Sequence, residues 1–166
     1  MADELEKIKD LRERTSAGVM DCKRALEASD WDIEKAVGYL LEQGIARAEK
    51  KADRITAQGL IDSYVHAGRI GAIVEVNCET DFVARTPDFQ SLVHEIAMQV
   101  AASNPVAISM EQVPEGAEGV TEDMTLLNQP YIRDPGKTIR QLITETIAKT
   151  GENIQIKRFS RFELGQ

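Results

Sequence analysis

Apolar residues in the first part of the chain recur at helical spacing and predict three short helices. A break at residues 15–18 separates the first helix from the second, the third begins near residues 29–30, and Gly44 follows its last apolar residues. The three apolar stripes are Leu5, Ile8 and Leu11; Val19, Cys22 and Leu26; and Ile33, Val37, Leu40 and Leu41. This succession of amphipathic helices predicts a small bundle with a thin core.

The pattern changes from helical to alternating after residue 58. Residues 59–66 and 70–79 read as two strands, and residues 67–69 between them suit the turn of a hairpin. In the second strand one face carries only apolar or small residues, namely Ile70, Ala72, Val74, Val76 and Cys78. This alternation is typical of an antiparallel sheet with one buried and one solvated face.

A helix and a long loop follow the hairpin. Thr86 before Pro87 is a typical helix start, because the hydroxyl suits the cap and Pro suits the first helical position. An apolar stripe continues toward residues 104–105, where Asn-Pro ends the helix. Residues 109–136 are acidic, rich in Gly and Pro, and weakly periodic, so we expect a long loop there with at most a turn of helix.

The chain closes with a helix from Ile139 to Gly151 and a strand over residues 153–164. The predicted fold class is α+β: an N-terminal three-helix domain followed by an antiparallel sheet backed by helices. Ala mixed with Arg and Lys between these two parts predicts a solvated connector, either helical or extended. The expected domains are residues 1–46, a linker over residues 47–58, and an α+β core over residues 59–166.

Composition and charge exclude several classes of protein. The 166 residues include 28 acidic and 20 basic side chains, and the net charge of −8 disfavours nucleic acid, whose binding depends on neutralising phosphates. No apolar run approaches the roughly 20 residues that span a bilayer, and the first residues lack a signal-peptide pattern, so we expect no membrane partner. Two cysteines are too few for a disulfide framework, which favours a reduced, cytoplasmic environment.

The residues form no strong catalytic or metal-binding pattern. Two Cys and two His far apart do not provide a metal site, and no Gly-rich phosphate loop with Lys-Ser/Thr occurs. A cysteine site would combine Cys78 with His66 or His94 and with Asp81, but Cys78 lies on the apolar face of its predicted strand. We therefore predict a protein that is not an enzyme and needs neither metal nor cofactor.

Two long strings carry more information than periodicity. Leu-Arg-Glu-Arg-Thr at residues 11–15 with Ala-Gly-Val-Met-Asp-Cys-Lys-Arg-Ala-Leu at residues 17–26 resembles the first signature of the elongation factor Ts family. Val-Glu-Val-Asn-Cys-Glu-Thr-Asp-Phe-Val at residues 74–83 resembles its second signature. Shorter strings that are similar to the end of the family's core occur at residues 129–131, 137–138 and 161–163. The resemblance covers nearly the whole chain and implies a ubiquitin-associated-like N-terminal domain.

The resemblance also implies a function. Members of this family are guanine nucleotide exchange factors for elongation factor Tu in translation elongation, and they bind it in its GDP-bound and nucleotide-free forms. The loop implied to disturb the magnesium and phosphate site of that GTPase consists of Thr80, Asp81, Phe82 and Val83. The residues implied to contact its nucleotide domain are Arg12, Met20 and Lys23, and His66 is similar to a position that contacts another domain.

The residues alone leave other roles open. Thr80 suits a helix cap, Asp81 suits a helix dipole, and Phe82 would equally fill the protein's own core. Met20 and Lys23 lie off the apolar stripe of their helix, where an ordinary solvated face is the commoner explanation. The alternative function is a small adaptor that binds a peptide or a ubiquitin-like surface through its three-helix domain.

The chain departs from the longer members of the family by having one core unit instead of two and no room for an inserted coiled-coil arm. This shortness implies a homodimer, or a two-to-two complex with elongation factor Tu, in which a second subunit supplies the missing unit. Ser16 stands where the family usually has Gly, and Val19 where Met is more common. Ser16 suits a helix start and Val19 keeps an apolar contact, so binding should persist.

Overall fold

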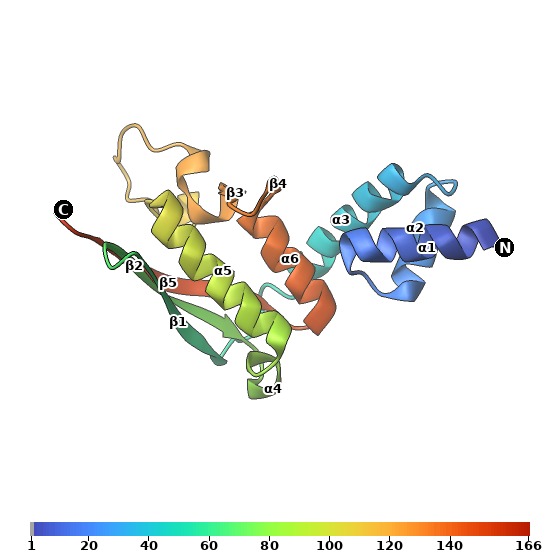
Figure 1. The fold of residues 1–166 in the computed structure, drawn as a ribbon, viewed down its shortest axis with the longest axis horizontal. Helices are drawn as coiled ribbons and strands as arrows, with labels where there is room; N and C mark the ends of the chain where they lie inside the picture. Colours follow the sequence, from blue (N-terminus) through green and yellow to red (C-terminus); the bar gives the residue numbers. More distant parts are fainter. Residues whose placement is uncertain (1) are drawn as a thin grey trace. The chain divides into compact units, whose positions relative to one another are not determined.

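The computed structural model describes residues 2–166, and Figure 1 shows the order of the elements along the chain. Two compact units form. The first extends to Asp53 and also includes Thr144–Glu152, whereas the second comprises Arg54–Ile143 and Asn153–Gln166. Helices come first and an antiparallel sheet with helices follows, which confirms the predicted α+β class. Among the described residues, no helix has the length and apolar character needed to cross a membrane.

The first unit contains the three predicted helices, α1 (Ala2–Thr15), α2 (Val19–Ala28) and α3 (Ile33–Glu49). Asp32 caps α3, because its side chain accepts a hydrogen bond from the Lys35 backbone N–H at 3.0 Å. The core of the bundle consists of Leu11, Cys22, Ala25, Leu26 and Ala36, with Ile8, Trp31, Val37 and Leu40 among the side chains that pack around it. The bundle is therefore built largely on the predicted apolar residues.

Two details of this unit differ from the prediction. Val19 is half exposed, and Ala25 takes its place in the buried stripe of α2, because Val19 is the first residue of its helix. Gly44 does not end α3, which continues to Glu49, so the first residues of the predicted linker are helical. A Cβ at Gly44 would lie 3.2 Å from Cγ2 of Thr144. The glycine thus allows close packing of residues 144–152, which the sequence had assigned to the core domain.

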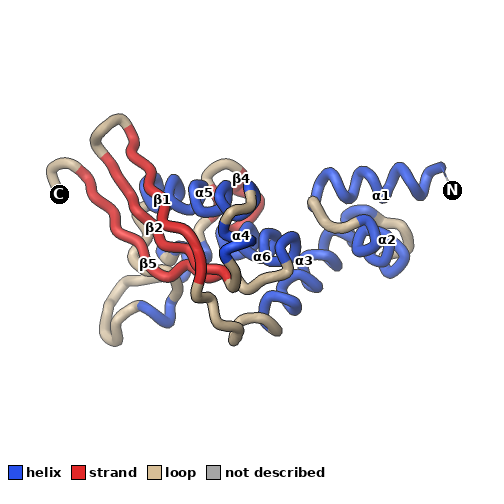
Figure 2. Tube along the Cα trace, turned by 90° about the horizontal axis from the view of Figure 1, so that it is seen from below, coloured by secondary structure: helices blue, strands red, loops and turns tan. Residues whose placement is uncertain are grey.

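The second unit is built on a three-stranded antiparallel sheet with the order β1-β2-β5. Its strands are β1 (Gln58–His66), β2 (Ile70–Cys78) and β5 (Ile154–Glu163). Helix α5 (Pro87–Ser103) lies along one face of the sheet, as Figures 1 and 2 both show. Its buried side chains include Phe89, Val93, Ile96 and Val100, and the sheet contributes Ala72, Val74, Val76 and Cys78. The predicted strands, turn and buried face are confirmed.

The predicted loop over residues 109–136 contains more structure than expected. It includes three short 3-10 helices at Met110–Gln112, Glu122–Met124 and Leu126–Asn128, the strand β3 (Pro130–Tyr131), and the start of β4 (Asp134–Thr138). The buried Gln99 side chain donates to the Pro130 carbonyl at 3.1 Å and accepts from the Ile132 N–H at 2.9 Å. One amide on α5 thus holds this segment, which apolar periodicity could not reveal. Helix α6 (Ile139–Thr150) follows as predicted.

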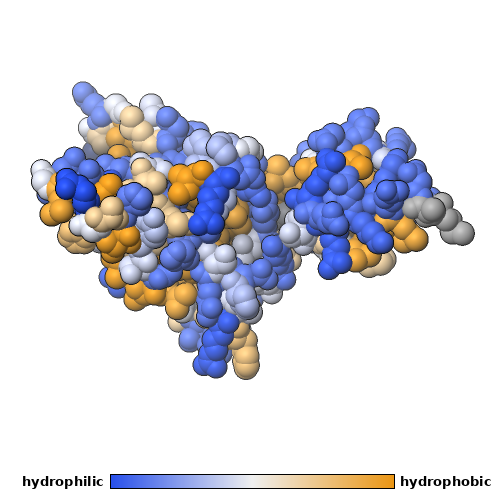
Figure 3. Space-filling view, viewed as in Figure 1, coloured by the Kyte–Doolittle hydropathy of each residue, from blue (hydrophilic) through white to orange (hydrophobic). Residues whose placement is uncertain are grey.

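The other face of the sheet carries exposed apolar side chains. In the register of the strands, Ile61, Ile73, Val65 and Phe162 alternate with the residues that face α5. Arg158 pairs with Glu75 across the strands on this face at 2.7 Å. Hydrophobic surface is visible beside the sheet, below α5, in Figure 3. We refer to these four apolar residues as the open face of the sheet.

Candidate functional site

The loop from Thr80 to Val83 connects the end of β2 to a short helix, α4 (Asp81–Ala84). Thr80 has an extended backbone and caps this helix, because its hydroxyl accepts the Val83 N–H at 3.4 Å. Its carbonyl accepts a hydrogen bond from the buried Cys78 thiol at 3.2 Å. Thr80 is therefore the cap that the local sequence predicted, and it links the loop to the end of the strand.

Phe82 is exposed on this helix. Its exposed fraction is 78 %, whereas Phe89 is fully buried and fills the core of the unit. The interpretation of Phe82 as a core residue is therefore wrong. Ala84 is the buried residue of α4, so the helix rests on its small side chain while the aromatic ring faces solvent.

Hydrogen bonds restrain the backbone on both sides of Phe82. Downstream, the Thr86 hydroxyl donates to the Val83 carbonyl at 2.8 Å and accepts the Phe89 N–H at 3.3 Å, which also caps α5. Asp81 pairs with Arg85 at 3.0 Å in an exposed ion pair. A large apolar side chain thus projects from a backbone with little freedom, which is the arrangement expected of a contact residue.

A second candidate surface lies on α2 in the first unit. Met20 is 64 % exposed, and Arg12 is also exposed. Lys23 lies 3.7 Å from Glu27 in an exposed ion pair, so its charge is shared with a neighbour on the same helix. The prediction that Met20 and Lys23 face solvent is confirmed. A shallow depression lined by Lys9, Arg12, Glu13 and Ser16 lies on α1 and at its end.

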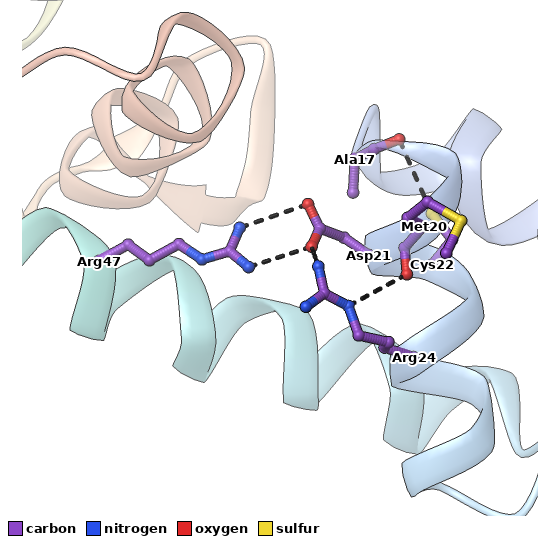
Figure 4. Close-up of polar contacts among 6 residues, drawn as sticks. All are labelled: Ala17, Met20, Asp21, Cys22, Arg24 and Arg47. Carbon is purple, nitrogen blue, oxygen red and sulfur yellow. Dashed lines mark hydrogen bonds and ion pairs between the residues drawn. The ribbon is translucent and has the colours of Figure 1, made fainter.

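Charged contacts hold α2 against α3 beside Met20 (Figure 4). Both guanidinium nitrogens of Arg47 donate to the Asp21 carboxylate, at 3.0 and 3.3 Å, and Arg24 donates to it at 2.6 Å. The hydrogen bond from Arg47 lowers the pKa of Asp21 below its ordinary value. In Figure 4 the Met20 side chain points away from this cluster, so it takes no part in these ion pairs.

His66 is exposed at the end of β1, near both the Tyr64 ring and the hairpin turn. The Tyr64 hydroxyl lies 3.1 Å from Nδ1 of His66, and the Tyr64 ring packs edge-on against His94. Because β2 runs from Ile70 beside His66 to Cys78 beside the loop, His66 and Phe82 lie at opposite ends of the sheet, about 26 Å apart along the strand. The structure does not bring these two predicted contacts together.

The geometry does not support a catalytic cysteine site. Cys22 and Cys78 are both buried thiols that are not joined in a disulfide, and burial raises the pKa of the Cys22 thiol. His66 lies at the far end of the sheet from Cys78. Within residues 2–166, no group of three or more His, Cys, Asp or Glu side chains could hold a metal ion.

Sequence reasoning missed one cluster beside the loop. From sequence, Glu79 appears only within the strand over residues 70–79 and the string at residues 74–83, but its carboxylate accepts the Asn153 backbone N–H at 2.7 Å and lies 3.6 Å from the Arg54 guanidinium. These residues are far apart in sequence, so no local pattern indicates the contact. The buried asparagine two residues after Gly151 is the nearest available signal.

Comparison with known proteins adds an independent line of evidence. The family model described as "Elongation factor TS" matches residues 7–119 and 117–166. An elongation factor Ts from Heliobacterium modesticaldum is 48 % identical over 190 residues, covering 96 % of this chain and 88 % of that protein. The corresponding protein of Thermoanaerobacter pseudethanolicus is 48 % identical with 96 % and 93 % covered, and that of Thermodesulfovibrio yellowstonii is 44 % identical with 100 % and 98 % covered.

These relatives contain residues that this chain lacks. The alignments extend over 190 or more positions, whereas the chain has 166 residues. The two matches to the family model meet at residues 117–119, in the turn between the 3-10 helices at Met110–Gln112 and Glu122–Met124. The chain is thus a short form with a single core unit.

Proposed function

The chain belongs to the elongation factor Ts family, and from this premise we propose that it is a guanine nucleotide exchange factor for elongation factor Tu, acting in the cytoplasm during translation elongation. The observation that best supports this role is Phe82, which is 78 % exposed on a capped four-residue helix at the end of a strand. A ring in this position can enter a cleft of a partner without any rearrangement of its own core.

Exchange of this kind needs no bond to be made or broken. A factor that binds the nucleotide-free GTPase more tightly than the GDP-bound form must weaken GDP binding by the same ratio, because the two equilibria are linked. Phosphates and Mg²⁺ are strong anchors of a bound nucleotide, so a contact that disturbs them releases GDP efficiently. The chain therefore acts as a ligand of elongation factor Tu and not as an enzyme in the usual sense.

The residues divide between two tasks. Phe82 and Asp81 reach toward the magnesium and phosphate site of the GTPase, while Thr80 and Val83 hold the backbone that presents them. Full burial of an aromatic side chain contributes about 1.5 to 3 kcal/mol, which sets the scale of the effect. Arg12, Met20, Lys23 and His66 provide further contacts that bind the partner.

The direct test measures release of labelled GDP from elongation factor Tu with and without the chain, together with binding to the GDP-bound and nucleotide-free forms. We expect faster release and tighter binding to the nucleotide-free form. An adaptor would bind both forms equally and leave the release rate unchanged, and that result would replace the exchange factor by the adaptor.

We also propose that the chain forms a homodimer, or a two-to-two complex with its partner, through the open face of the sheet. Phe162 is 72 % exposed and Val65 is 65 % exposed on this face, and Ile61 and Ile73 continue the apolar surface. Two such faces would bury each other's apolar side chains, as in the packing of sheets face to face. Sedimentation of the free chain and of the complex measures the stoichiometry.

A further inference from the structure

We infer that Glu79 is a positioning residue for the proposed exchange reaction, acting with Arg54 and Asn153 to fix the base of the loop that presents Phe82. The inference rests on the proposed function and adds a residue to the machinery that presents the ring. We refer to Arg54, Glu79 and Asn153 as the Glu79 clamp.

The three residues of the clamp form a closed ring of contacts. Oε1 of Glu79 accepts the backbone N–H of Asn153 at 2.7 Å and lies 3.6 Å from Nη1 of Arg54. The Asn153 side-chain amide donates to the Arg54 carbonyl at 2.9 Å. The start of the second unit, the end of β2 and the start of β5 are thereby tied at one point.

Burial determines which of these contacts matters most. Asn153 is 2 % exposed and the Glu79 side chain 22 %, so the hydrogen bond between them is shielded from water and satisfies a buried backbone N–H. The Arg54 side chain is 53 % exposed, and an ion pair of that kind is weak. The Glu79 carboxylate is therefore the central member of the clamp.

The clamp acts on Phe82 through the backbone. Only Thr80 and Asp81 separate Glu79 from Phe82, and α4 is too short to hold its own orientation. Its direction is set at both ends, by Thr86 downstream and by the clamp upstream. A shift of the strand end moves the ring by a similar amount, and misplacement by about 1 Å can cost a hundredfold in a positioned reaction.

Loosening the loop should affect the maximal release rate and the half-saturating concentration differently. A ring on a loosened loop still contacts the partner, so the concentration of factor that gives half-maximal release changes little. Its ability to displace the metal and phosphates depends on rigid placement, so the maximal release rate falls. A residue that served only the stability of the unit would leave both quantities of the folded protein unchanged.

The experiment follows GDP release from elongation factor Tu over a range of concentrations of the chain. We expect Glu79→Ala to lower the maximal rate about tenfold while the half-saturating concentration changes by less than about threefold. Glu79→Gln keeps an oxygen that accepts the Asn153 N–H, so it should retain most of the maximal rate that Glu79→Ala loses. Arg54→Ala should have only a small effect on this rate. In the double variant Phe82→Ala/Glu79→Ala the loss equals that of Phe82→Ala alone, because the clamp acts through the ring.

Thermal unfolding of each variant shows that it is folded. Should Glu79→Ala fail to fold, Glu79→Asp takes its place, since it keeps the charge but ends one methylene short of Asn153. Full activity of the folded variant, or losses that multiply in the double variant, would overturn the inference. If the wild-type chain does not accelerate GDP release from elongation factor Tu, the proposed function and this inference are overturned together. If the wild-type chain and the Glu79 variant accelerate release equally, only the inference is overturned.

Discussion

Met20 on α2 in the first unit and Phe82 on the loop before α5 in the second unit are both large, exposed apolar side chains, but they lie in different settings. Met20 lies on a ten-residue helix among charged neighbours, and the ion pair between Asp21 and Arg47 joins that helix to α3. Phe82 lies on a four-residue helix at the end of a strand. The first setting offers a broad face, and the second a single projecting ring.

Within the proposed function, this difference predicts a division of work. A helix face would make the same contact whether or not the partner holds its nucleotide, and such uniform binding raises affinity without raising the maximal rate. A projecting ring would compete for space with the metal and phosphates, so its contact would be made fully only when they leave. Substitutions in the two regions should therefore change different kinetic quantities.

The largest effect is expected from Phe82→Ala. Removing a contribution of about 1.5 to 3 kcal/mol should lower the maximal rate of stimulated GDP release by about 10- to 150-fold. The thermal midpoint should not fall, because the ring is exposed in the free protein. Ile55→Ala is the matched control, since Ile55 is an even more exposed apolar residue outside both regions. An unchanged release rate in folded Phe82→Ala would refute the proposed role of the loop.

Met20→Ala should have a smaller effect of another kind. We expect the half-saturating concentration to rise about three- to tenfold, because part of an apolar contact is lost, while the maximal rate stays the same. Ala28→Ser, at the other end of α2 and also exposed, serves as a control. A fall in the maximal rate with unchanged affinity would reverse the assignment of the two regions.

Disrupting the open face of the sheet tests whether one molecule of elongation factor Tu contacts the α2 surface and the Phe82 loop of the same chain. Ile73→Lys places a charge among the apolar residues of this face and should yield a monomer in sedimentation. If both regions of one chain serve the same partner, the release rate per chain should change by less than about threefold. If the monomer no longer accelerates GDP release, the α2 surface and the Phe82 loop that contact one partner must belong to different chains of the dimer.

The smallest effect on release is expected from Asp21→Asn, which changes stability instead. Arg47 lowers the folded-state pKa of Asp21, so this carboxylate stabilises the first unit above its ordinary pKa, and the contribution is lost as the pH falls through the lower folded value. Because both partners are partly exposed, the variant should lose at most about 1 kcal/mol at pH 7. Measured by denaturant unfolding, the difference from wild type should shrink as the pH falls below the ordinary aspartate pKa of 3.8, and a pH-independent difference would contradict the assignment.

Local sequence predicted the elements that depend on neighbouring residues. Thr86 and Pro87 start α5, Asn104 ends it in a left-handed conformation, and the alternation in β2 matches its buried face. These features follow from capping, fixed φ and period-two burial, which operate within a few residues. The family also followed from sequence, since both long signatures lie in the strings that the comparisons match.

Contacts between distant residues could not be predicted in the same way. Gly44 resembles a helix end in sequence, yet its missing side chain accommodates Thr144, one hundred residues away. The segment bonded to Gln99 shows no periodicity in sequence, although isolated residues such as Leu126 are buried, because contacts with distant residues such as Gln99 help to order it. The Glu79 clamp joins residues from three segments for the same reason.

The sequence by itself determined the α+β class, the order of the main strands and helices, and the family to which the chain belongs, because each of these depends on local pattern or on long matching strings. Only the tertiary structure decided whether Phe82, unlike Phe89 on the apolar stripe of α5, fills the core or lies in solvent. Phe82 and Phe89 are equally apolar, but α4 rests on Ala84 while α5 packs Phe89 against the sheet. Packing geometry therefore left Phe82 in solvent, and that exposure supports its proposed contact with a partner.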